Sequence, residues 1–266
     1  MSTKAYYAVI LILIALILGI MISAFIPEGE DRSQDVLYQI STIDALMQSV
    51  YDGIMPAGEL KKHGNFGIGT FDGLEGEMVA LDGRYYQVKS DGVAYPVNDS
   101  IMIPFATVTY YESDQTIHVN GTGNFTQLTG AIDAGLPSKN LFYAIRIDGT
   151  FPYIKTRSIP KQEKPYVSLV NASKNQSVFE LYNTTGTIVG FYSPQYVSGV
   201  NVPGYHLHYI TSDGKAGGHV LDMSTGEVDV SLDITPDFYM YLPTSGDFIG
   251  KDLTKDLHEE LKQVEN

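Results

Sequence analysis

Hydrophobic residues follow one another almost without interruption near the start of the chain. The run extends from Ala5 to Ile26, with Lys4 before it and an acidic stretch after it. A run of this length can cross the hydrocarbon core of a bilayer as a helix, and the lysine on its N-terminal side places the following residues outside the cytoplasm. We therefore expect a hydrophobic helix in residues 1–27, acting as a signal peptide or membrane anchor, and an extracytoplasmic body that is secreted or anchored by this helix.

After this leader the period of the hydrophobic positions changes. Apolar residues recur at intervals of three and four from Val36 to Val50, which predicts an amphipathic helix that ends near Gly53. From Gly67 onward apolar and polar residues alternate between Asp-Gly pairs, which predicts a β-meander. A short helix is expected in FTQLTGAIDAGL and a final helix in residues 251–266. Further strands are expected in LFYAIRIDG, FPYIKTRSIP, VFELYN, TIVGFYSP, YHLHYI and EVDVSLDI.

The order of these elements predicts the fold class. Helices and alternating strands without a regular βαβ repeat indicate an α+β fold: two packed mixed or antiparallel β-sheet domains with a few helices, after the N-terminal hydrophobic helix. No repeat or low-complexity linker divides the chain. We place a soft boundary near residue 150, between an N-terminal α+β domain (residues 32–150) and a C-terminal metal-binding domain (residues 151–266).

Composition excludes several classes of function. The 266 residues carry a formal net charge of −14, which argues against binding to nucleic acid phosphates and requires a local positive centre for any anionic substrate. The chain has no cysteine, so disulfides and thiolate metal sites are impossible and any metal must be held by nitrogen and oxygen. The chain also has no Gly-x-Ser-x-Gly nucleophile elbow.

Three of the six histidines lie in GYHLHYITSDGKAGGHVLDM, residues 204–223. His206 and His208 are two residues apart, so on a strand both side chains project from one face. If Asp213-Gly214 forms a two-residue turn, His208 lies opposite His219, and all three imidazoles share that face. A bulge at the glycine pair before His219 would shift this register.

Two interpretations of these histidines remain open. Alternating histidines on a strand are more often exposed or hydrogen-bonded residues than ligands, whereas a third histidine in register favours a metal site. Three neutral nitrogen ligands leave coordination positions free, which is typical of catalytic zinc. Glu77 shares a face of its predicted strand with Val79 and Leu81 and so points inward. Taken alone, Glu77, Arg157 and Glu265 would be a sheet-rim residue, a surface cation and part of a frayed tail.

Four long blocks of the sequence favour the functional interpretation of these residues. In order, they are GNFGIGTFDGLEGEMVALDG, GTFPYIKTRSIPKQEKPY, GTIVGFYSP and VPGYHLHYITSDGKAGGHVLD. Together they resemble the alpha-acetolactate decarboxylase family, and the similarity extends from about Leu37 to the C-terminus. The hydrophobic leader departs from many members of the family, which bears on location rather than on chemistry.

The resemblance implies a role for each candidate residue. It implies that His206, His208 and His219 bind Zn²⁺, that Glu265 is a metal-contacting carboxylate and a catalytic residue, that Glu77 and Arg157 are catalytic, and that Thr70 and Arg157 contact the substrate. It further implies two α+β domains, with the zinc in the C-terminal half and Glu77 supplied by the N-terminal half, and a homodimer.

The function implied is zinc-dependent decarboxylation of 2-acetolactate, a small molecule, to acetoin and carbon dioxide in acetoin and butanediol biosynthesis. We expect Glu77 to be the acid/base, Glu265 to assist the metal, and Arg157 to position the substrate carboxylate. One alternative is another extracytoplasmic zinc lyase or hydrolase acting on a related 2-hydroxy-3-keto acid. A non-catalytic extracytoplasmic binding module is the other.

Overall fold

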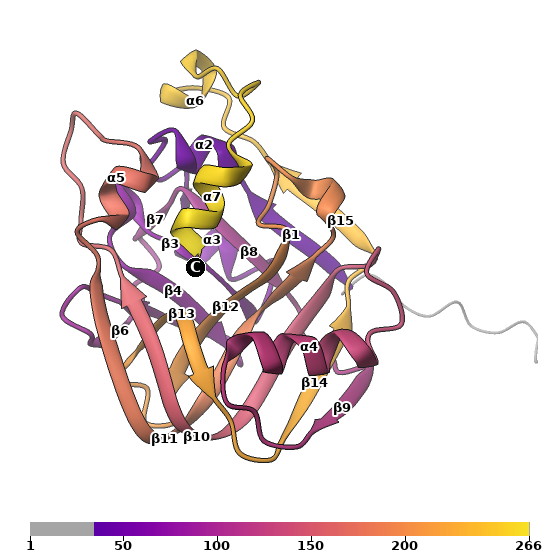
Figure 1. The fold of residues 1–266 in the computed structure, drawn as a ribbon. Helices are drawn as coiled ribbons and strands as arrows, with labels where there is room; N and C mark the ends of the chain where they lie inside the picture. The colour runs from indigo at the N-terminus through magenta and orange to yellow at the C-terminus, as the bar shows by residue number, and fades with distance from the viewer. Residues whose placement is uncertain (1–34, 266) are drawn as a thin grey trace, which may run out of the picture. The chain divides into compact units, whose positions relative to one another are not determined.

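Two β-sheets pack against each other in the part of the chain that this computed structural model describes, residues 35–265 (Figure 1). The hydrophobic helix expected in residues 1–27 lies outside the described residues. Among residues 35–265 no helix is long and apolar enough to cross a membrane. The predicted α+β class agrees with what is described, which is mostly β-sheet with a few short helices.

The first sheet has seven strands in the order β15-β1-β8-β3-β4-β5-β6. Its strands pair antiparallel, except that β1 and β15 run parallel. Asp82 and Gly83, at φ 51° and 75°, join β4 to β5 in a two-residue turn with the positive angles that a tight hairpin of this kind requires. The strands are β1 (Val36–Ile40), β3 (Phe66–Thr70), β4 (Glu77–Leu81), β5 (Arg84–Val88), β6 (Ala94–Pro96), β8 (Phe105–Thr109) and β15 (Asp237–Tyr241).

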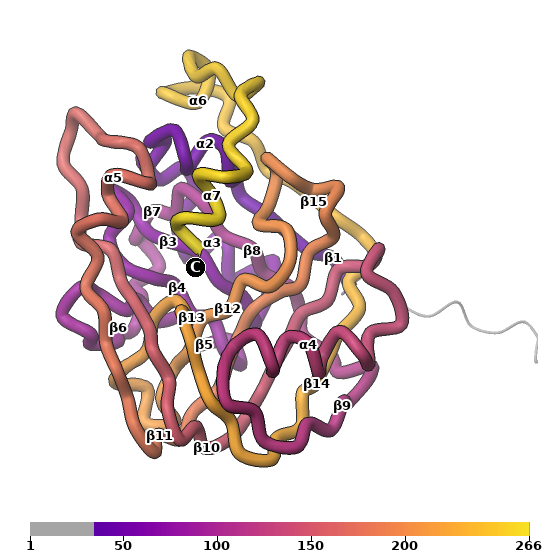
Figure 2. The backbone as a smooth tube through the Cα atoms, viewed as in Figure 1, coloured from indigo at the N-terminus to yellow at the C-terminus, as the bar shows by residue number. Residues whose placement is uncertain are grey.

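The second sheet has six strands in the order β11-β12-β13-β10-β14-β9, and β11 also pairs with β10. This extra pairing closes β10, β11, β12 and β13 into a small barrel. Figure 2 follows β10 and β11 as two long neighbouring strands. The strands are β9 (Gln115–Val119), β10 (Tyr143–Ser158), β11 (Ser177–Ser193), β12 (Gly204–Thr211), β13 (Gly217–Ser224) and β14 (Val228–Ile234).

Short helices connect or follow the strands. They are α2 (Ile43–Met47), α3 (Ala57–Leu60), α4 (Phe125–Gly135), α5 (Leu169–Ser173), α6 (Asp247–Gly250) and α7 (His258–Glu265), with the 3₁₀ turns η1 (Asp72–Leu74) and η2 (Gln195–Val197) and a two-stranded ribbon of β2 (Met55–Pro56) and β7 (Met102–Ile103). The helix expected in FTQLTGAIDAGL is α4, and Asn124 caps it by accepting from the Gln127 amide.

Side chains on the two faces of β12 have different surroundings. Leu207 and Tyr209 belong to the hydrophobic core of the second sheet. Ile210, on the opposite face of the strand, joins a second core that holds the two sheets together. His206 and His208 share the parity of Ile210, so period-two geometry directs both imidazoles toward the first sheet.

The helix predicted from Val36 to Val50 is wrong in its first half. Residues 36–40 form strand β1, and only Ile43–Met47 is helical. Ser41, at φ 61°, separates the two elements, and Gln48 caps the helix, so Gly53 is not the cap. Pairing of β1 with both β8 and β15 decides this segment, because tertiary hydrogen bonds override a local helical period.

The boundary expected near residue 150 falls inside a strand. LFYAIRIDG and FPYIKTRSIP form the single strand β10, which pairs with β11 on both sides of that residue. Strand β15 joins the first sheet, and β9 joins the second. Each sheet therefore contains a strand from the opposite half of the chain. The final helix is also shorter than expected, because it begins only at His258.

Candidate metal centre and active site

The hairpin of β12 and β13 holds the three histidines in the predicted register. His208 lies directly opposite His219, and His206 is two residues earlier on the same strand. The loop differs from the predicted two-residue turn: the Ser212 amide donates to the Thr185 carbonyl instead of pairing with Lys215. The register survives because Thr211 still donates to the carbonyl of Ala216 across the loop.

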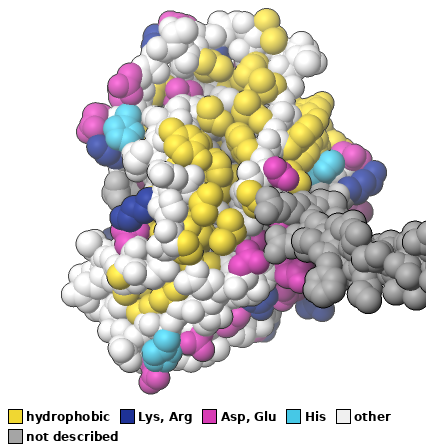
Figure 3. Space-filling model, turned by 90° about the vertical axis from the view of Figure 1, so that its right-hand side faces the viewer, with side chains coloured by type: hydrophobic (Ala, Val, Ile, Leu, Met, Phe, Trp, Pro, Cys, Tyr) yellow, Lys and Arg dark blue, Asp and Glu magenta, His cyan; other side chains and the backbone are white. Residues whose placement is uncertain are grey.

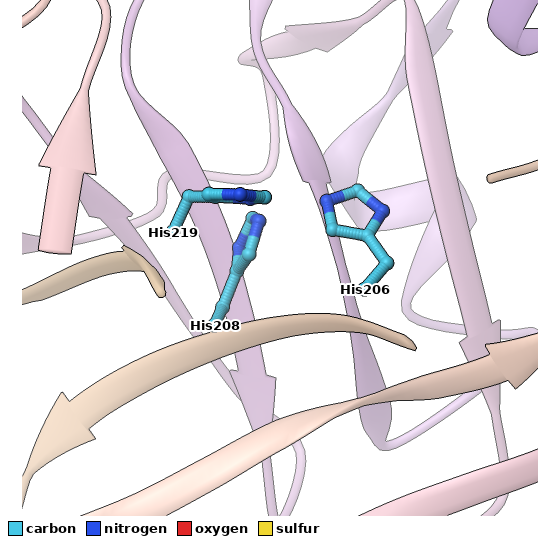
Figure 4. A group of neighbouring side chains, drawn as sticks. All are labelled: His206, His208 and His219. Carbon is cyan, nitrogen blue, oxygen red and sulfur yellow. The ribbon is translucent and has the colours of Figure 1, made fainter. Parts of the chain in front are cut away.

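The three imidazoles converge on one point (Figure 4). One ring nitrogen from each histidine lies within 4.8 Å of the others. The ring centroids of His206 lie 5.1 Å from those of His208 and His219, and the last two are 5.4 Å apart. This spacing allows the three nitrogens to share one ion.

Hydrogen bonding and burial leave these histidines in the form that a metal requires. His208 donates from Nδ1 to the Met78 carbonyl at 2.8 Å, so its Nε2 carries a lone pair. Burial, together with the charge of Arg157, lowers the pKa of His206 to about 3, and burial also lowers the pKa of His208 and His219. Among the described residues, Nε2 of His208 and Nδ1 of His219 have no hydrogen-bond partner. Neutral, buried imidazoles with free nitrogens fit a divalent metal ion.

Strand β4 brings Glu77 to this cluster from the first sheet. Glu77 begins the strand opposite Thr70 of β3, and its side chain is buried. Its Oε2 lies 3.6 Å from Nε2 of His208, and its Oε1 accepts from Nη1 of Arg157 at 2.9 Å. The prediction that Glu77 faces inward is therefore correct.

Arg157 occupies the centre of the group. It lies on β10 directly opposite His219, and only 4% of the residue is exposed. Besides Glu77, it contacts the end of α7: Nη2 donates to the Val264 carbonyl at 3.3 Å and lies 4.0 Å from Oε1 of Glu265. In the described part of the chain its Nε has no hydrogen-bond partner.

Glu265 reaches the histidines from the last turn of α7. Its Oε2 lies 3.6 Å from Nε2 of His206 and 3.9 Å from Nε2 of His219. The buried side chains of Leu261 and Val264 fix this helix against the core that includes α2 and α5. Figure 1 shows α7 in yellow, with the C-terminal end close to β4, β12 and β13.

Burial changes the acidity of both carboxylates. Desolvation raises the pKa of Glu77 to about 7; the Arg157 charge opposes this rise, and the charge of Glu265 adds to it. Desolvation likewise raises the pKa of Glu265 to about 7 against the charge of Arg157. Carboxyl groups with such values exchange protons near neutral pH.

A cavity of about 30 Å³ lies beside these groups and is lined by Thr70, Glu77, Arg157 and Glu265. The Thr70 hydroxyl donates to the Gly76 carbonyl at 2.8 Å. No sequence pattern indicated the apolar wall of this cavity, because its members lie on several elements that are distant in the chain. They are Ile43, Leu46, Leu74, Phe105, Ile159 and Leu169.

A second cavity, of about 330 Å³, lies along α7. It is lined by His219 and Glu265 at the metal centre and by His258 and Lys262 along the helix. Glu265 therefore lines both cavities. The sequence offered no reason to connect His258 with the site.

Comparison with known proteins identifies the family. The family model for alpha-acetolactate decarboxylase matches residues 37–255. The chain belongs to the alpha-acetolactate decarboxylase family. The matched range includes every predicted site residue except Glu265, and members of the family are carboxy-lyases.

Named decarboxylases and their structures are similar to the chain over most of its length. The alpha-acetolactate decarboxylase of Methanosarcina mazei is 57% identical over 92% of this chain and 85% of its own length. That of Methylococcus capsulatus is 44% identical over 91% of this chain and 92% of its own. The crystal structure of the Bacillus subtilis alpha-acetolactate decarboxylase superimposes with a TM-score of 0.84, at 40% identity, over 87% of this chain and 99% of that one.

Proposed function

We propose that this chain decarboxylates 2-acetolactate to acetoin and carbon dioxide, with a zinc ion held by His206, His208 and His219. One observation carries the proposal: three neutral histidines, the buried pair Glu77–Arg157 and Glu265 meet at one centre. Membership of the decarboxylase family supports the reaction.

Zinc suits the donor set, because three imidazoles leave coordination positions free and Glu265 can add a carboxylate oxygen. When bound, zinc supplies a Lewis acid that polarises the hydroxyl and ketone oxygens of the substrate. Oε2 of Glu265 has no hydrogen-bond partner among residues 35–265 and lies 3.6 Å from Nε2 of His206. This oxygen is therefore available to bind the same ion as the histidines.

Glu77 serves as the acid/base in this proposal. Loss of carbon dioxide breaks the bond to the carboxylate and leaves its electron pair on the substrate, so one carbon must then gain a proton. The pKa of Glu77, raised to about 7, lets the group hold that proton near neutral pH and release it. Delivery from a fixed position protonates one face and gives one enantiomer.

Arg157 has two tasks. Its Nη1 holds the Glu77 carboxyl in place, while its free Nε offers a donor to the substrate carboxylate. A guanidinium is always charged and presents several donors in one plane. In a chain with a net charge of −14, this cation and the metal supply the local attraction for an anionic substrate. The apolar wall of the smaller cavity keeps water away from the reacting carbon.

The test is metal-dependent formation of acetoin and carbon dioxide from racemic 2-acetolactate by residues 28–266. Metal-stripped protein and the variant His208→Ala are expected to be inactive, and the control His118→Ala, an exposed residue outside the site, is expected to be active. Restoring activity with zinc, and not with magnesium, supports the metal assignment. Stoichiometric zinc binding without acetoin would contradict the substrate and favour another zinc lyase or hydrolase.

The proposal extends to location. The hydrophobic run Ala5–Ile26 supports secretion or anchoring at the outer face of a membrane. Fractionation of the source cells is expected to place the body outside the cytoplasm. An intact N-terminus in the membrane fraction would indicate an anchor, and a cleaved one a signal peptide. Recovery in the cytoplasm would contradict both.

We also propose a homodimer. Strand β15 is an edge of the seven-stranded sheet. Three of its large hydrophobic residues, and the leucine that follows the strand, are exposed: Phe238, Tyr239, Tyr241 and Leu242. Figure 3 shows hydrophobic side chains gathered on the side of the molecule that carries β15. Such an exposed edge is an aggregation hazard unless another surface covers it. Light scattering of Tyr241→Glu is expected to show a monomer, whereas Tyr182→Glu, an exposed tyrosine on β11, leaves the dimer intact.

A further inference from the structure

Serine or threonine follows asparagine at the second position unusually often in this chain. Six of its ten asparagines begin an Asn-x-Ser/Thr triplet: Asn98, Asn120, Asn124, Asn171, Asn175 and Asn183. The serine and threonine content alone would give about one such triplet. The triplet is the acceptor for N-glycosylation of secreted proteins.

The fold places all six side chains at the surface. Each of the six asparagines is exposed, whereas Asn65 and Asn201, which are not in a triplet, are half-buried and buried. Asn201 uses its amide within the fold and donates to Thr107. The triplets therefore occupy positions where an attached group meets solvent.

The amide nitrogen is the atom to which a glycan would be attached. In the described part of the chain, Nδ2 makes no hydrogen bond in five of the six triplets; at the sixth, Asn171 donates to Ser168. Asn98 and Asn124 use only their Oδ1 atoms, as acceptors in a turn and in a helix cap. Substitution at Nδ2 would thus leave the local structure intact in these five.

The six positions avoid the functional surfaces. None of them lines either cavity at the metal centre, and none lies on β1 or β15. Asn183 is the one position of the six with a positive φ. It lies on β11 opposite Pro152, where the ladder to β10 is interrupted, and it has φ 49°, a left-handed conformation that asparagine tolerates.

We propose that the chain is N-glycosylated on this surface, with Asn183 as the principal site. The proposal rests on the extracytoplasmic location proposed above and is independent of the decarboxylase reaction. The donor is a lipid-linked glycosyl phosphate or diphosphate. A bond forms between Nδ2 and the anomeric carbon, the bond from that carbon to the phosphate oxygen breaks, the amide loses one proton to a base, and the lipid phosphate leaves as an anion. Nothing is oxidised or reduced.

The experiment uses the full chain produced in its own source cells and digested for mass spectrometry. The peptide that contains Asn183 is expected to carry the mass of a glycan. Thr185→Ser keeps the triplet and is expected to keep the glycan, whereas Thr185→Ala and Asn183→Gln are expected to lose it. Both threonine variants retain the asparagine, so the pair isolates recognition of the triplet.

Acetoin formation is measured on the same samples. It is expected to be equal in Thr185→Ser and Thr185→Ala, because this position is remote from the site. Unmodified asparagine in all six triplets would overturn the proposal, whether the protein is recovered outside or inside the cytoplasm. Loss of acetoin formation in the wild-type chain would contradict the proposed function and leave the glycan result unaffected.

Discussion

At the scale of single residues, Glu77 is the side chain on which the proposed chemistry most depends. Glu77→Gln keeps the shape and the contact with Arg157 but removes the ionisable group. We expect zinc to stay bound and kcat to fall about 100-fold or more, a typical effect of removing a general acid. Steady-state kinetics and metal analysis of the same sample check this.

Glu75→Gln is the matched control, because Glu75 pairs with Lys89 outside the site. Its kcat should equal that of the wild type. Full activity in Glu77→Gln would remove Glu77 from the mechanism, and loss of zinc would assign it to the metal centre instead.

Burial of His206 predicts a pH effect on the metal-free protein. Its pKa is lowered to about 3 in the fold, from an ordinary value of 6.5. The unfolded chain therefore binds a proton on His206 at a higher pH than the folded protein does. As the pH falls from the unfolded pKa toward the folded pKa, the folded form loses stability relative to the unfolded chain. Relative to His206→Gln, we expect the wild type to lose about 1 kcal/mol of stability for each pH unit over that window. Urea unfolding of both proteins at several pH values measures the difference; parallel curves would contradict the assignment.

At the scale of elements, the hairpin register depends on Gly218. Its φ of 129° is unfavourable for other residues, and a Cβ there would lie 2.5 Å from the Arg157 carbonyl. Gly218→Ala should therefore separate β13 from β10, displace His219, destabilise the fold by about 2 kcal/mol or more and weaken zinc binding. Gly226→Ala is the control, since the nearest atom to a Cβ there is 4.0 Å away. Denaturation and chelator competition measure both effects.

Helix α7 is the other element that the site requires. Deleting residues 257–266 removes Glu265 and the contact of Arg157 with the Val264 carbonyl. We expect the two sheets to remain folded, with zinc affinity lowered about tenfold or more, as on loss of a ligand's supporting shell, and activity abolished. Circular dichroism and zinc titration test this. Glu260→Gln, an exposed position on α7, should leave both properties unchanged.

At the scale of the whole molecule, the two halves of the chain depend on each other. Cutting at residue 150 divides β10, separates β9 from β14 and separates β15 from β1. We expect residues 28–150 and 151–266, produced separately, to be unfolded and unable to bind zinc, because each sheet then exposes unpaired edges. Circular dichroism of each half decides this, and a cooperative unfolding transition in either one would restore the boundary near residue 150 as a domain division.

Local sequence patterns were enough to predict one part of this site. A strand has a period of two, so the spacing of His206 and His208 places both on one face, and the short loop fixes His219 opposite His208. Glu77 could be assigned inward for the same reason. These relations depend only on neighbouring residues and one turn, and the structure confirms them.

The remaining features of the fold and the site depend on contacts between distant parts of the chain. Residues 36–50 have a helical period, but pairing with β8 and β15 makes the first of them a strand. From local pattern alone, Arg157 and Glu265 were a surface residue and a tail residue, and only the family resemblance indicated a role for them. In the structure, β10 and α7 place both beside the histidines. The apolar wall comes from elements far apart in sequence. Periodicity reports which face a residue occupies, whereas long-range packing decides what that face meets.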